Sequence, residues 1–150
     1  MNLYGVLKFL HVLSVVFWIG GVSALWLTTL RIAKAGDYST VAKLLPVGMG
    51  YGQRVVGPAS GFVLITGIWM AYISHLFSQP FVGIGFVGIL VHFILGATLV
   101  RRTWMRMGQL IDEPNRDQVA LTATVKRATT VSWVYLLTMV IVIAAMVLKP

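Results

Sequence analysis

The sequence predicts an all-α integral membrane protein, a four-helix transmembrane bundle with up-down topology and both termini outside. Hydrophobic residues make up 58% of the chain and charged residues 11%, whereas soluble domains carry roughly 25% charged residues. Mean hydropathy is +0.87. Apolar runs near 20 residues, the length that crosses the hydrocarbon of a bilayer, occur four times. They predict one domain over residues 1–150, with spans at about 3–30, 55–77, 81–100 and 131–148.

The first span carries Lys8, whose long side chain can reach the headgroups, and is too long for a cleaved signal peptide. Residues 32–54 follow as a loop rich in Gly and Pro, with a short amphipathic helix at 39–45. In the second span, Gly57 and Gly61 form a small-xxx-small pair that predicts close helix packing.

The link at 78–80 is so short that the second and third spans must be antiparallel neighbours. After the third span, residues 103–130 form a polar segment. Asp112-Glu113-Pro114-Asn115 breaks this segment, and a surface helix at 118–127 leads into the last span.

Charge predicts the orientation of the bundle. The net charge is +8, and the two long loops hold all the basic residues except Lys8 and Lys149. Because cytoplasmic loops collect Lys and Arg, both loops are expected in the cytoplasm. The membrane therefore accounts for the positive charge, and nucleic acid is not an expected partner.

Three histidines, His11, His75 and His92, fall within predicted spans, where ionisable residues are rare and mark functional sites. The chain has no Cys, which leaves His as the best soft ligand, and paired His residues suit a b-type haem. The alternative is that each histidine hydrogen-bonds between helices or lies at the headgroups.

Depth along the helices separates two possible pairs. Counted from the nearest arginine at 1.5 Å per residue, His11 and His75 both lie about 30 Å from the cytoplasmic edge, and His92 about 14–21 Å. His11 with His75 matches in depth, whereas His11 with His92 is better enclosed. Both pairs stay open.

Two helix faces bear on these sites. Gly85, Gly88, His92 and Gly96 form one stripe, which either admits a flat macrocycle or allows close helix packing. His11, Ser14, Trp18 and Gly21 share an inward face of the first span. Seven methionines leave copper as a weaker alternative cofactor.

The segment at residues 7–21, LKFLHVLSVVFWIGG, resembles the first helix of the HemJ-type membrane protoporphyrinogen oxidases and the related CopD-like membrane proteins. Residues 54–68 resemble the same group through Arg54, Pro58 and Gly67, and the end MVLKP is similar too. The resemblance covers less than half of the chain. It implies a bacterial-type inner membrane, b-type haem and His11 as a haem ligand. The third span lacks the family's Lys, and KRATTVSW stands where the family has Asn-Glu-Pro.

The sequence therefore predicts a haem-b-binding membrane protein in electron transfer or in redox chemistry on a lipophilic substrate. If it is an enzyme, it is a membrane oxidoreductase. The alternative is a copper-handling or non-catalytic accessory subunit. The bilayer is the expected partner, with a homo-oligomer or a larger membrane complex left open.

Overall fold

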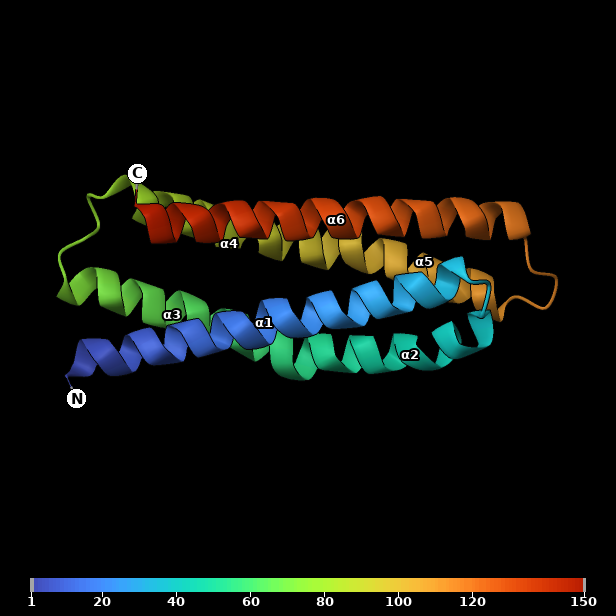
Figure 1. Cartoon of the computed structure of the whole chain (residues 1–150), viewed down its shortest axis with the longest axis horizontal. Helices are drawn as coiled ribbons and strands as arrows, with labels where there is room; N and C mark the ends of the chain where they lie inside the picture. The colour runs from blue at the N-terminus through green and yellow to red at the C-terminus, as the bar shows by residue number, and fades with distance from the viewer. Residues whose placement is uncertain (1, 150) are drawn as a thin grey trace.

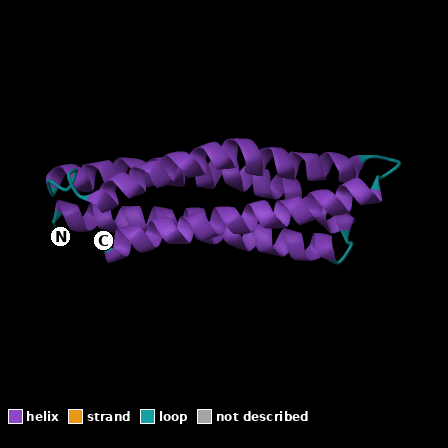
Figure 2. Ribbon diagram, turned by 90° about the horizontal axis from the view of Figure 1, so that it is seen from above, coloured by secondary structure: helices purple, strands orange, loops and turns teal. Residues whose placement is uncertain are grey.

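The computed structural model describes residues 2–149, so Pro150, the last residue of the MVLKP motif, lies outside it. Within these residues every regular element is helical, and four helices are long and apolar enough to cross a membrane. Both termini and the α3–α4 connection lie at one end of the bundle, and the other two connections lie at the opposite end (Figure 1). The view from above shows the same long, nearly parallel rods (Figure 2). The predicted all-α architecture with four long apolar helices is confirmed.

The elements follow one another with few breaks. Their bounds are α1 Leu3–Lys34, α2 Tyr38–Tyr51, η1 Gly52–Val56, α3 Gly57–Ile73, α4 Pro80–Leu95, η2 Gly96–Val100, α5 Arg101–Asp112 and α6 Gln118–Leu148. The short elements η1 and η2 are π-helical turns. They join their neighbours into continuous helices over Tyr38–Ile73 and Pro80–Asp112.

The short helix predicted at residues 39–45 is confirmed and is longer than predicted, because it belongs to α2. The rest of the loop predicted at residues 32–54 is therefore mostly wrong. A turn at Gly36, with φ +82°, ends α1, and the Asp37 side chain caps α2 by accepting a hydrogen bond from the Thr40 N–H at 3.1 Å. Pro46 lies inside α2, where its ring costs the helix one hydrogen bond. Burial of Val41 and Leu45 compensates for that loss.

The polar segment predicted at residues 103–130 is also mostly helical. It contains α5 and the first third of α6, joined by the short break around Pro114. One face of α5 is apolar and fully enclosed, with Met107 and Leu110 at most 1% exposed, whereas Arg106 on the same helix is exposed. Such a sharply two-faced helix is typical of a protein surface in water.

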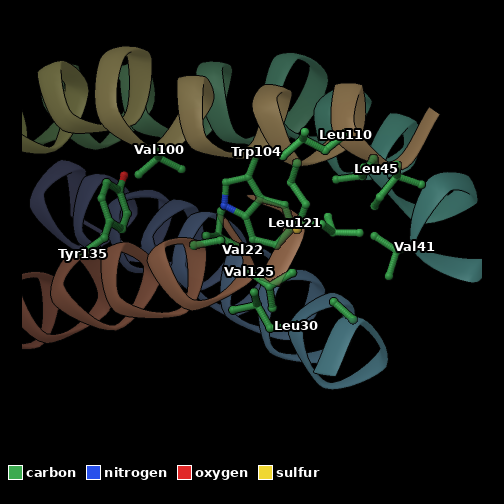
Figure 3. Close-up of a cluster of buried hydrophobic side chains, with 14 of the residues drawn as sticks. Val22, Leu30, Val41, Leu45, Val100, Trp104, Leu110, Leu121, Val125 and Tyr135 are labelled. Atoms are coloured by element: carbon green, nitrogen blue, oxygen red, sulfur yellow. The ribbon is translucent and has the colours of Figure 1, made fainter. Parts of the chain in front are cut away.

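The bundle therefore has two halves with different surroundings. The half next to the α1–α2 and α5–α6 turns, which we call the projecting half, has a dense core. Figure 3 shows Trp104 at the centre of this core, with Leu45, Leu110, Leu121 and Val125 around it. The half next to the termini, which we call the membrane half, exposes large apolar side chains to its surroundings, among them Phe9, Val16, Phe62, Val87, Leu90, Leu137 and Val140.

Glycines set the close contacts of the membrane half. A Cβ atom on Gly88 would lie 2.6 Å from a methyl carbon of Val142, and one on Gly85 would overlap with the Met146 methyl carbon. These glycines therefore bring α4 and α6 together. A Cβ on Gly61 would meet nothing within 4 Å, and one on Gly57 only a carbonyl oxygen at 3.7 Å. The close packing predicted for Gly57 and Gly61 is wrong within this chain, since no neighbouring helix lies against them.

Residues 74–77, placed in the second span by the sequence, form a turn after α3 instead. The other three predicted spans lie inside α1, the α4–α5 helix and α6.

Candidate functional site

His11 lies at the contact between α1 and α3. Its Nδ1 atom is 3.0 Å from Oγ1 of Thr66. When the Thr66 hydroxyl donates its proton to the backbone carbonyl of Phe62, its oxygen can accept a hydrogen bond from Nδ1–H of the imidazole. In that tautomer the other ring nitrogen, Nε2, holds the lone pair.

The His11 imidazole lies over Gly67. A Cβ atom at Gly67 would be 3.3 Å from Cε1 of the ring, so the missing side chain provides the room that the imidazole needs. The imidazole is half-buried. Within the described residues its Nδ1 atom is the ring nitrogen that has a hydrogen-bond partner, and Nε2 forms no hydrogen bond.

The predicted inward face of α1 continues from His11 towards the projecting half. Trp18 is 5% exposed. The ring of Tyr51 fills the space left by Gly21, and its hydroxyl donates a hydrogen bond to the Phe17 carbonyl at 2.6 Å. The face therefore packs against α2 and α3, as its pattern predicts.

His92 is buried between α4 and α6. Nδ1 donates to the carbonyl of Gly88, one turn earlier, at 2.7 Å. Nε2 lies 3.0 Å from the Thr138 hydroxyl and 3.3 Å from the Tyr135 carbonyl. Both ring nitrogens are thus held by the protein, and a metal at Nε2 would have to displace Thr138.

His75 lies in the turn that ends α3. Its φ is +53°, a conformation that His adopts more readily than most non-glycine residues. Leu76 N–H bonds to the Ala71 carbonyl and His75 N–H to the Tyr72 carbonyl, which is the Schellman pattern of a helix C-terminus. The exposed His75 thus occupies the position where a helix usually has glycine.

The structure does not bring the three histidines together. Thr66, the partner of His11, precedes His75 by nine positions, or about 13 Å of helix. His92 contacts the Tyr135 ring, and Tyr135 contacts Trp26, with ring centroids 4.8 and 5.3 Å apart. Trp26 is 15 positions from His11, or about 22 Å along α1, so His92 lies closer to the projecting half than His11 does. Neither predicted His pair is assembled.

The glycine stripe of α4 serves helix packing at two of its members, because Val142 and Met146 fill the space beside Gly88 and Gly85. An apolar groove of about 500 Å³ remains between α4 and α6, lined by Pro80, Gly83, Ile84, Val87, Gly88, Val91, His92, Thr138, Ile141 and Val142. The groove reaches His92, but the ring nitrogens of His92 are already occupied.

Three further residues, Thr66, Thr138 and Tyr135, belong to the surroundings of the histidines and are not predicted from the sequence. Each hydroxyl or ring contacts a histidine across a helix interface. Thr66 and Thr138 carry no signal in a single sequence, because a threonine in an apolar helix most often bonds to its own backbone. Only the tertiary structure shows their second contact.

Two methionines of the described residues fill packing positions. Met107 is fully enclosed in the projecting core, and Met146 packs on Gly85. Among residues 2–149 there is also no group of three or more His, Cys, Asp or Glu side chains that could hold a metal ion.

No curated protein and no solved structure matches this sequence. A family described as "Predicted integral membrane protein (DUF2269)" matches residues 5–150, nearly the whole chain. That description agrees with the four long apolar helices and the lipid-facing surface of the membrane half. The protein belongs to the DUF2269 family of integral membrane proteins.

Proposed function

We propose that the protein binds haem b through Nε2 of His11 and takes part in membrane electron transfer or in redox chemistry on a lipophilic substrate. The observation that carries this proposal is the state of the His11 ring. Its Nδ1 atom is paired with Thr66, and its Nε2 atom forms no hydrogen bond within the described residues. A histidine that ligates a metal almost always donates its other ring N–H in this way, which fixes the tautomer and raises the basicity of the ligand.

A single histidine nitrogen as the ligand from the protein fits haem better than a bare copper ion. The porphyrin supplies four ligands of its own, so one protein nitrogen is enough to hold it, whereas a copper site needs several soft protein ligands. When bound, haem supplies a one-electron couple at its iron. The chain would hold the imidazole in one orientation and surround it with apolar side chains.

The resemblance supports the same residue. His11 and Gly67 belong to the two short sequence segments that resemble the HemJ-type and CopD-like proteins. In the structure the His11 ring packs against Gly67. With His92 held by Gly88 and Thr138, His11 is the histidine in a span whose Nε2 forms no hydrogen bond within the described residues. We therefore expect one histidine ligand from the protein and a high-spin ferric spectrum.

We also propose a bacterial-type plasma membrane, with the projecting half in the cytoplasm and the termini outside. The support is the distribution of charge, since ten of the twelve basic residues lie between Arg31 and Arg127 and basic residues favour the cytoplasmic side.

The test is the haem content of the purified protein, measured as the pyridine haemochrome per mole of folded protein. His11→Ala should lose at least ninety per cent of the haem. The matched control is His75→Asn, because asparagine tolerates a positive φ and His75 is an exposed turn residue. It should keep its haem.

A wild type that is colourless and takes up no added hemin would overturn the proposal and favour the accessory-subunit alternative. Full haem content in His11→Ala with loss in His92→Ala would move the site to the α4–α6 groove and refute the assignment to His11.

A further inference from the structure

Six basic side chains lie near the middle of the bundle, on three of its four long helices. They come from the α2–α3 helix, the start of α5 and the first third of α6, and all six are exposed: Arg54, Arg101, Arg102, Arg106, Lys126 and Arg127. We call this set the basic belt. It is separate from His11 and does not depend on the proposed function.

Contacts between helices place these residues at one level. Leu45 of α2 lies beside Gly108 of α5, and the two helices are antiparallel. Arg54 is nine positions after Leu45, and Arg101 is seven positions before Gly108. Arg54 therefore lies level with the start of α5. Gly88 of α4 faces Val142 of α6. Arg101 and Arg102 are 13 and 14 positions after Gly88, and Arg127 is 15 positions before Val142. These three arginines therefore lie at nearly the same level. The belt therefore lies on three of the four long helices, where the membrane half meets the projecting half.

The distance from the belt to the far end of the bundle equals the thickness of a bilayer. Arg54 is 19 positions from the end of α3 at Ile73, Arg101 is 21 from Pro80, and Arg127 is 21 from Leu148. At 1.5 Å per residue these segments are about 28 to 32 Å long, and the hydrocarbon core is about 30 Å thick. The belt thus lies at the level of the lipid headgroups.

The acidic residues are kept away from this level. All four lie at the tip of the projecting half, where Asp37 begins α2 and where Asp112, Glu113 and Asp117 flank the α5–α6 turn. Four basic residues, Arg31, Lys34, Lys43 and Arg116, lie in the same part of the projecting half. The tip therefore has no net charge, whereas the belt carries six positive charges and no negative charge.

We propose that the basic belt binds the phosphate groups of anionic phospholipids, with Arg101, Arg102 and Arg106 of α5 and Lys126 and Arg127 of α6 as its strongest part. The guanidinium group matches phosphate oxygens in a bidentate geometry, and a basic side chain near a charged membrane surface contributes to lipid binding. The apolar flanks of α4 and α6 below the belt accommodate the acyl chains, so the occupant is a lipid rather than a free anion.

The experiment is native mass spectrometry of the full-length protein in detergent, titrated with phosphatidylglycerol or with phosphatidylcholine of the same chain length. The wild type should bind phosphatidylglycerol more tightly. Arg101→Gln with Arg102→Gln should weaken this binding about thirtyfold, and the Arg→Lys pair should recover part of it.

The matched control is Lys34→Gln with Lys43→Gln, which removes two positive charges at the tip and should change the affinity less than twofold. Thermal unfolding in detergent checks that each variant is folded. Equal binding of both lipids by the wild type, or equal losses in the belt and tip variants, would overturn the proposal. Displacement of the lipid by millimolar inorganic phosphate would show a free-anion site instead.

Discussion

The Nδ1 atom of His11 on α1 lies 3.0 Å from the Oγ1 atom of Thr66 on α3, and this hydrogen bond joins two helices inside the membrane half. The Thr66 hydroxyl has one proton, which it donates to the Phe62 carbonyl. The direction of the bond is therefore set by α3, and α3 decides which nitrogen of His11 carries the lone pair.

Thr66→Val should weaken haem binding tenfold to a hundredfold, the usual effect of losing the partner of a ligating histidine. The variant keeps the volume of the side chain but removes the acceptor, so the ring can turn. Titration with hemin, followed by absorbance, measures the affinity. Thr98→Val is the control, because Thr98 bonds to the carbonyl of Ile94 in its own helix. Equal affinities in the two variants would contradict the role of Thr66.

Gly88→Leu should lower the melting temperature in detergent by several degrees, because its side chain would overlap with Val142 and force α4 away from α6. Gly61→Leu is the matched control, since a Cβ there meets nothing within 4 Å. The melting temperature of the control should stay within about two degrees of the wild type. A larger loss in Gly61→Leu would mean that this face packs against a second molecule.

A reporter that is active only in the cytoplasm should be active when inserted after Asp112 and inactive after Gln79. A periplasmic reporter should show the opposite pattern. The two sites lie at opposite ends of the same helix, Pro80–Asp112, so each fusion serves as the control for the other. The reverse result would place the basic belt at the outer leaflet and would refute the proposed orientation.

Asp37 should make the start of α2 sensitive to acid. Hydrogen bonds from Thr40 and Ser39 lower the pKa of the Asp37 carboxyl below its ordinary value of 3.8. Because its pKa is depressed in the folded state, the ionised cap stabilises α2 above pH 3.8, and this contribution is lost as the pH falls through the folded-state pKa.

Hydrogen exchange measures that effect at the amides of the first turn of α2. In Asp37→Ala these amides should exchange faster than in the wild type at pH 6, and the difference should shrink below pH 4. The first turn of α6, which is capped by Asp117, is unchanged in the variant and provides the internal control. A difference that does not depend on pH would show that the cap acts without its charge.

The four spans could be predicted from the sequence because apolar runs of bilayer length are rare outside membrane helices. The projecting half could not be predicted in the same way. In α2, Pro46 and several glycines suggest a loop, yet burial of Val41 and Leu45 and packing of α2 against α1 and α5 stabilise the helix. Tertiary packing overrode local propensity at these residues.

The site shows the same difference between residue types. His11 was identified because an ionisable group in a span is conspicuous, and Trp18 and Gly21 on its face were predicted correctly to point inward. The depth pairing of His11 with His75 was not reproduced, because His11 lies level with Thr66. The two counts began at different levels: Arg31 is near the end of α1, whereas Arg54 is at the middle of the helix Tyr38–Ile73. A count along one helix does not show how far the neighbouring helix is displaced along the bundle axis.

The two π-helical turns, Gly52–Val56 and Gly96–Val100, lie at or just before the level of the basic belt. Each π-helical turn accommodates one residue more than an α-helical turn, which changes the phase of the side chains after it by about 100°. The face that α4 presents to α6 therefore need not be the face that α5 presents. One continuous helix can thus bury one face in the membrane half, where lipid surrounds it, and a different face in the projecting half, where water surrounds it. A substitution that straightened either turn would rotate the two halves of the protein out of phase while leaving each helix intact.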